Sequence, residues 1–173
     1  MNRRKAVNNL AIAAAGLIIL PQWMISCGLS DSKTHSSSFL LSEQKTLSSI
    51  ADTIIPPGKS IGALSVEVDK YLQKLIDDCL EKEVKDNVKI QLNAIEANAE
   101  KQHGKSFANC TQKQREDLLL KFAASENKQE KDFFNLMKTE TIRGFNTSQK
   151  VMKEYLGYQV APGHYYGCVN IKS

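Results

Sequence analysis

This 173-residue chain holds four cysteines, and the chemistry of each depends on whether it forms a disulfide or stays a free thiol. Cys79 and Cys110 fall at the ends of two predicted helices, which a helical bundle can bring together, so a disulfide between them is one expectation. Cys168 would then be left over, either for a bridge to another protein or as a tolerated thiol. Exposed free thiols are unusual in an oxidising compartment, so bridging is the thiol chemistry that we expect if the chain is exported.

Histidines and carboxylates form no set with a catalytic or metal-binding spacing. His35, His103 and His164 are scattered, and although His164 precedes Cys168 by four residues, a spacing that two zinc ligands can share, no second Cys/His pair accompanies them. The chain has no glycine-rich dinucleotide or phosphate-binding loop, no Gly-x-Ser-x-Gly elbow and no Cys-x-x-Cys-His haem motif. We therefore predict no catalytic, cofactor-binding or metal-binding residue in this chain.

Aromatic rings gather between residues 133 and 168, which hold seven of the chain's eleven Phe and Tyr residues. Their spacing at three and four residues places several rings on one helix that needs a partner surface. Two interpretations stay open: the rings pack on the chain's own core, or they anchor another protein, as aromatic side chains commonly do. The predicted partner interface comprises Phe133, Phe134, Phe145, Tyr155, Tyr165 and Cys168.

Residues 1–27 have the three-part architecture of an export signal: a basic start, an uncharged apolar run over residues 10–20, and a polar break at Pro21. That run of 11 residues is short for a membrane-spanning helix, which needs about 20. The pair Arg3-Arg4 before a modestly hydrophobic core is similar to a twin-arginine signal, which exports folded proteins. The residues around the pair depart from the usual pattern, so the general secretory route remains the alternative.

Cys27 is a candidate for lipidation, because residues 24–27 (MISC) resemble a lipoprotein box with a small residue before the acylated cysteine. The alternative is an unmodified thiol. Residues 28–39 are rich in Ser and other hydrophilic residues and predict a flexible tether. A domain over residues 40–173 then follows. We expect the protein in the periplasm or at the periplasmic face of a membrane, with a lipid anchor if Cys27 is acylated.

The net charge of +4 is concentrated at the N-terminus, where Arg3, Arg4 and Lys5 contribute three positive charges before the first acid at Asp31. The remainder is close to neutral, so binding to nucleic acid has little support. A hydrophobic fraction of 42% and a charged fraction of 24% predict one domain with a core.

Apolar residues at three- and four-residue spacing predict helices over residues 42–55, 66–80, 83–102, 129–144 and 148–156, with a further helix capped by Thr111 and Gln114. Ser42 is the expected N-cap of the first helix. Cys79 should lie on the apolar face of the second, and Val84 should open the apolar stripe of the third. No stretch shows the alternation of a strand. The predicted fold class is all-α, a compact array of about five to six helices after the export signal and tether.

Five segments together resemble the gluconate 2-dehydrogenase subunit 3 family: residues 47–56 (LSSIADTIIP), 133–137 (FFNLM), 144–148 (GFNTS), 156–158 (LGY) and 166–168 (YGC). The resemblance covers residues 40–168. It implies a non-catalytic small subunit that escorts a large FAD-dependent sugar or polyol dehydrogenase of the glucose-methanol-choline class through export. FAD would belong to the large subunit, and electrons would pass to a cytochrome c or another membrane-linked acceptor, with haem c in a third subunit. The alternative is a free-standing helical lipoprotein with a structural or ligand-binding role at the membrane.

Overall fold

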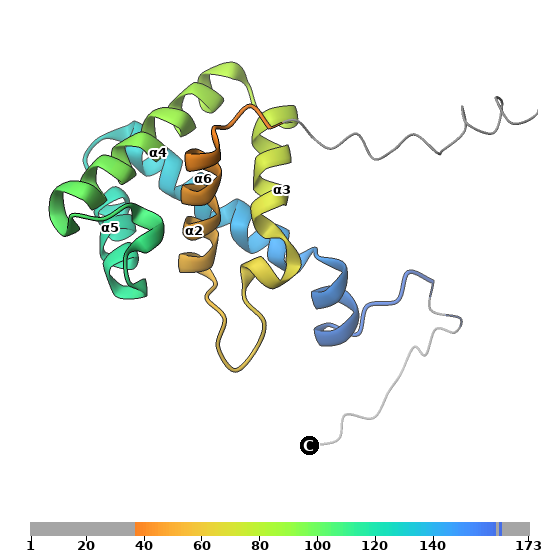
Figure 1. Ribbon diagram of the computed structural model, residues 1–173. Coiled ribbons are helices and arrows are strands. Elements are labelled where there is room, and N and C mark those ends of the chain that lie inside the picture. The colour runs from red at the N-terminus through yellow and green to blue at the C-terminus, as the bar shows by residue number, and fades with distance from the viewer. Residues whose placement is uncertain (1–36, 162, 164–173) are drawn as a thin grey trace, which may run out of the picture. The chain divides into compact units, whose positions relative to one another are not determined.

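The computed structural model describes residues 37–161 and residue 163. In this part of the chain every regular element is a helix, which confirms the all-α prediction (Figure 1). The export signal, most of the tether, Arg3, Arg4, Cys27, Tyr165 and Cys168 lie outside the described residues. The elements are, in order, α2 (Leu41–Ile54), η1 (Ala63–Val66), α3 (Val68–Lys74), η2 (Leu75–Cys79), α4 (Lys82–His103), η3 (Phe107–Asn109), α5 (Gln112–Ala124), α6 (Lys128–Asn146) and η4 (Val151–Tyr155).

The central element is α2, which contacts α3, α4, α5 and α6. Leu47, Ile50 and Ala51 are completely buried. Because several faces of α2 are covered, hydroxyl side chains are buried as well, and each needs a hydrogen-bond partner. The hydroxyls of Ser49 and Thr53 donate to carbonyl oxygens one turn earlier in the same helix, at 2.9 and 2.6 Å. A helix with small hydroxyl residues can therefore pass through the middle of the domain.

The start of α2 differs from the prediction. Ser42 was expected as the N-cap, but the helix begins at Leu41, and the Leu40 N–H donates to the Glu43 carboxylate at 2.8 Å. Ser42 instead lies in the first turn, where its carbonyl accepts a hydrogen bond from the Thr46 hydroxyl. The Glu43 carboxylate satisfies the N–H of the N-cap residue Leu40, as the third helical residue of a capping box does.

The predicted helix over residues 66–80 is divided into three pieces. Glu67 adopts a left-handed conformation (φ 57°) between η1 and α3, and the helix widens to a π-helical turn in η2. A π-helical turn contains more residues than an α-helical turn, so the buried stripe continues through Val68, Leu72 and Ile76. The prediction that Cys79 lies on the apolar face is wrong, because this residue is exposed.

The prediction for α4 is confirmed over Val88, Leu92, Ile95 and Ala99, all of which are buried, but Val84 remains 37% exposed. The helix ends at Gly104, whose φ of 63° suits glycine. The cap of α5 is also confirmed: the Gln114 N–H donates to the Thr111 hydroxyl at 3.4 Å, and the Thr111 N–H donates to the Gln114 side chain at 2.9 Å.

The core is closed by α6, which packs against α5, α3 and α2. The Phe133 ring is 1% exposed and lies 6.1 Å from the Phe122 ring, centroid to centroid. Met137, one turn later, is buried on the same face. Among the helices that the structure describes, none has the length and apolar character needed to cross a membrane.

Candidate partner interface

The segment after α6 begins with the helix break that the sequence predicted. The Ser148 hydroxyl donates to the Phe145 carbonyl at 2.7 Å and accepts from the Val151 N–H at 3.4 Å. It therefore ends one helix and caps the next. Val151 is 5% exposed, so it fixes η4 to the end of α6.

From Tyr155 onward the large apolar side chains of the described segment face solvent. Tyr155, Leu156, Tyr158 and Val160 are 54%, 62%, 51% and 84% exposed, and we call these four residues the C-terminal face. The Tyr158 N–H donates to the Met152 carbonyl at 2.8 Å, and Gly157 permits the turn with a φ of 60°. Single exposed apolar residues are ordinary, but four within six positions of one segment are unusual and are typical of a segment that contacts a partner.

A hollow of about 540 Å³ adjoins this segment. Its walls come from η1 with the following Glu67, and from the start of η4. Glu67 in its left-handed conformation is paired with Lys70, whose hydrogen bond and charge lower the pKa of the Glu67 carboxyl. The lining residues are mostly polar: Ser65, Val66, Glu67, Ser148, Gln149, Lys150, Lys153 and Glu154.

The structure separates the aromatic residues that the sequence grouped as one interface. Phe133 as an anchor on the free surface is a wrong prediction, because this ring is in the core. Phe134 and Phe145 are half-buried and pack against the core, whereas Tyr155 is exposed. The apolar neighbours of Tyr155 on the C-terminal face were missed, since the Gly- and Pro-containing segment after Tyr155 has no periodicity that could distinguish an inward from an outward position.

A partly buried hydrogen-bond cluster connects α3 to the end of α6, from which the C-terminal segment starts. The Tyr71 hydroxyl donates to the Glu140 carboxylate at 3.1 Å, and Arg143 pairs with the same carboxylate at 2.9 Å. Burial, aided by the bond to Glu140, raises the pKa of Tyr71. A Cβ atom on Gly144 would lie 2.5 Å from the Tyr71 ring, so the ring packs directly on the backbone of α6. Only glycine permits this contact.

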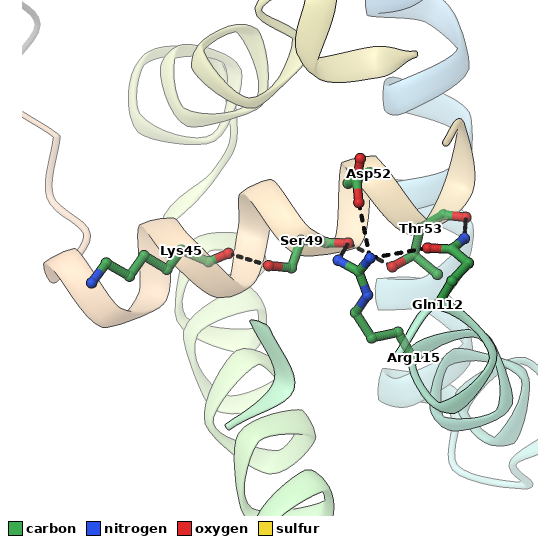
Figure 2. Close-up of polar contacts among 6 residues, drawn as sticks. All are labelled: Lys45, Ser49, Asp52, Thr53, Gln112 and Arg115. Atoms are coloured by element: carbon green, nitrogen blue, oxygen red, sulfur yellow. Dashed lines mark hydrogen bonds and ion pairs between the residues drawn. The ribbon is translucent and has the colours of Figure 1, made fainter. Parts of the chain in front are cut away.

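A second polar cluster joins α2 to α5 (Figure 2). Arg115 forms an ion pair with Asp52 at 2.9 Å and donates to the side chain of Gln112 at 3.0 Å and to the Ser49 carbonyl at 3.4 Å. The Gln112 amide in turn donates to the Thr53 carbonyl at 3.0 Å. The carboxylate of Asp52 is thus engaged by a guanidinium between two helices, which suits a structural connection better than acid–base chemistry.

The two cysteines in the described part of the chain lie in different environments. Cys79 is exposed after the π-helical turn, whereas Cys110 is buried and its thiol donates to the Ser106 carbonyl at 3.5 Å. Both are free thiols, so the expected Cys79–Cys110 disulfide is not formed. The rotation of η2 is the reason, because it carries the Cys79 side chain out of the core.

Over residues 37–161 and 163, no group of three or more His, Cys, Asp or Glu side chains is placed to hold a metal ion. His103 instead lies 3.3 Å from the side-chain amide of Gln114, where α4 ends beside α5.

Comparison with known proteins gives one family. No curated protein and no solved structure matches the chain. The family model described as gluconate 2-dehydrogenase subunit 3 matches residues 42–163, which include every helix from α2 to η4 except the first residue of α2. The match confirms the resemblance seen in the sequence, and the chain belongs to the gluconate 2-dehydrogenase subunit 3 family.

Proposed function

We propose that this chain is a non-catalytic small subunit of an FAD-dependent sugar or polyol dehydrogenase, and that it binds the large flavoprotein subunit through the C-terminal face. Its membership of a dehydrogenase-subunit family supports the proposal. Within the described residues, the buried Glu43 and Glu140 and the partly buried Asp52 each have a structural partner: Glu43 accepts from the Leu40 N–H, and Glu140 and Asp52 each pair with an arginine. FAD and the sugar chemistry then belong to the large subunit, of the glucose-methanol-choline class, and haem c to a third subunit.

The observation that carries the proposal is the ordered exposure of the C-terminal face. Tyr155, Leu156 and Tyr158 are more than half exposed although hydrogen bonds hold their backbone in place. Large apolar side chains that are fixed before binding lose little conformational entropy on binding, which makes them effective anchors. The adjacent polar hollow supplies the rim that surrounds such anchors.

The leader extends the proposal to export. A signal similar to the twin-arginine type would carry a folded complex, so this chain would escort a large subunit that has no leader of its own. The complex would then work in the periplasm or at the periplasmic face of a membrane, held there by the lipid on Cys27. Cys168, in the tail, would link the two subunits by a disulfide.

Lysine reactivity in the complex tests the interface. Tagged chain is isolated with its partners from the native cell, and acetylation of each lysine is compared before and after dissociation. Lys150 and Lys153 line the hollow and should react several-fold more slowly in the complex, whereas exposed Lys101 and Lys105 at the end of α4 serve as controls. Equal reactivity of Lys150 and Lys153 in both states would place the partner elsewhere.

Export and composition are tested in the same cells. Absence of a flavoprotein from the isolated material, with the chain free, would favour the free-standing lipoprotein. Arg3→Lys combined with Arg4→Lys should stop export of this chain and the large subunit together. Continued export of the large subunit would refute the escort role.

A further inference from the structure

The junction through which the N-terminal segment enters the helical domain is held from two sides. The Ser38 N–H donates to the Asp77 carboxylate at 3.1 Å, and the Ser38 hydroxyl donates to the other oxygen of the same carboxylate. From the opposite side, the Lys89 ammonium donates to the Ser38 carbonyl at 3.2 Å. Asp77 belongs to η2 and Lys89 to α4, so two distant elements meet at one residue of the junction.

The next residue is fixed by burial. Phe39 is 4% exposed and belongs to the hydrophobic core, although it precedes the first described helix. The Lys89 ammonium lies 5.5 Å from the centre of the Phe39 ring, within the range of a cation–π contact. The Phe39 carbonyl accepts from the Gln44 amide at 2.9 Å. Hydrogen bonds thus hold Ser38, and burial in the core holds the next residue, Phe39.

These contacts exceed what the start of α2 requires. A helix start needs acceptors for its first N–H groups, and Glu43 already supplies one to Leu40. Ser38 lies before the helix and is exposed, so water could satisfy its polar groups. Its actual partners are 39 and 51 residues away in sequence. Hydrogen bonds to charged groups are stronger than neutral ones, so the three that Ser38 makes with Asp77 and Lys89 fix its position.

Asp77, whose carboxylate binds Ser38, is itself held in place. The Lys85 ammonium donates to the backbone carbonyl of Asp77, which ties η2 to the first turn of α4. The π-helical geometry of η2 sets the direction in which Asp77 points, and π-helical turns recur where a side chain has a particular task. Lys85 thus holds Asp77, and Asp77 holds Ser38. Lys89 also holds Ser38, so the four residues are connected.

We propose that Asp77, Lys85 and Lys89 form a clamp on Ser38–Phe39 that fixes where the N-terminal segment leaves the helical domain. The clamp prevents the junction from peeling off α4 when the N-terminal segment is held or pulled. The clamp does not depend on the proposed function.

Amide hydrogen exchange on the full chain tests the clamp without a partner. In Asp77→Ala, the amides of Ser38 to Leu40 should exchange about tenfold faster, because a hydrogen bond to a charged group is lost. Lys89→Met keeps the length of the side chain, removes the donor, and should accelerate the same amides. Asp86→Ala is the matched control, since Asp86 is an exposed carboxylate on the first turns of α4.

The amides of α5 report global unfolding. If Asp77→Ala also accelerates α5, the milder Lys89→Met variant decides, with chymotryptic cleavage after the buried Phe39 as its second measurement. Faster exchange and cleavage at the junction, with α5 protected, support the clamp. Exchange at Ser38 to Leu40 that stays at the wild-type rate in Lys89→Met and in Asp77→Ala overturns it. Binding of the large subunit, measured separately, reports only on the proposed function.

Discussion

The core-facing side of α6 and the C-terminal face are adjacent in sequence and both rich in aromatic residues, yet they meet opposite fates. Phe133 is 1% exposed and packs on Phe122, whereas Tyr155 is 54% exposed. The core-facing side of α6 completes the core that α2 and α5 also line. The C-terminal face lies beyond Val151, the last buried residue among those described, and its side chains are exposed.

The difference teaches that aromatic content alone does not identify a binding surface. Phe133 and Phe134 are neighbours, but a step of one residue rotates a helical side chain by about 100°, from the core to its edge. Each Tyr side chain of the C-terminal face carries a hydroxyl that can bond to water, so its ring can lie at the surface. Burial therefore separates a ring that stabilises the domain from a ring that is available to a partner.

Among the substitutions that test this comparison, Phe133→Ala should have the largest effect on stability. Removing a fully buried ring leaves a cavity beside Phe122 and should lower the free energy of unfolding by about 3–5 kcal/mol. Urea denaturation of the full chain measures the change, and Phe134→Ala, at a half-buried ring on the same helix, should cost less. Equal losses at the two positions would contradict the division into core and edge.

Gly144→Ala should come next. Alanine normally stabilises a helix interior relative to glycine by about 0.5–1 kcal/mol. Here the added Cβ would lie 2.5 Å from the Tyr71 ring, and overpacking should instead cost about 1–3 kcal/mol. The control is the same substitution in a Tyr71→Ala background, where Gly144→Ala should be neutral or stabilising. A destabilisation that persists without the ring would show that the clash is not its cause.

Tyr155→Ala should reverse the pattern seen at Phe133. Because the side chain is more than half exposed, the free energy of unfolding should change by less than about 0.5 kcal/mol. Affinity for the large subunit should fall about tenfold, as measured by titration of the purified subunits. Gln159→Ala, at an exposed polar position of the same segment, is the control. Unchanged affinity in Tyr155→Ala would remove this residue from the interface.

Tyr71→Phe tests the connection between the two regions through pH and should have the smallest effect. The pKa of Tyr71 is raised in the folded state, so above about pH 10 the unfolded chain loses this proton first. The Tyr71 contribution to stability is therefore complete below that pH and lost as pH rises through the folded pKa. Unfolding at pH 8 and 10.5 should show a shallower decline in Tyr71→Phe than in wild type, with Tyr155→Phe as the control. Parallel declines in all three would contradict the assignment.

Much of the fold follows from local sequence patterns. The stripe from Val88 to Ala99, the Thr111 cap of α5 and the break at Ser148 were predictable because each depends on residues within two turns of one another. The exposure of Cys79 was not predictable, since it follows from the π-helical turn of η2, which changes the direction of the side chains relative to a regular helix. The candidate interface was found only in part: Tyr155 was identified, whereas Leu156, Tyr158 and Val160 lack periodicity.

The helical class, most helix boundaries and the family follow from the sequence alone, because these depend on periodicity, caps and the order of short motifs. Only the tertiary structure decided which of two adjacent phenylalanines is buried, why position 144 requires glycine, and how Ser38 is held by residues 39 and 51 positions away. The physical reason is the same in each case. A side chain's environment is set by the surfaces of other helices, and a local pattern specifies the face of a helix but not what packs against it.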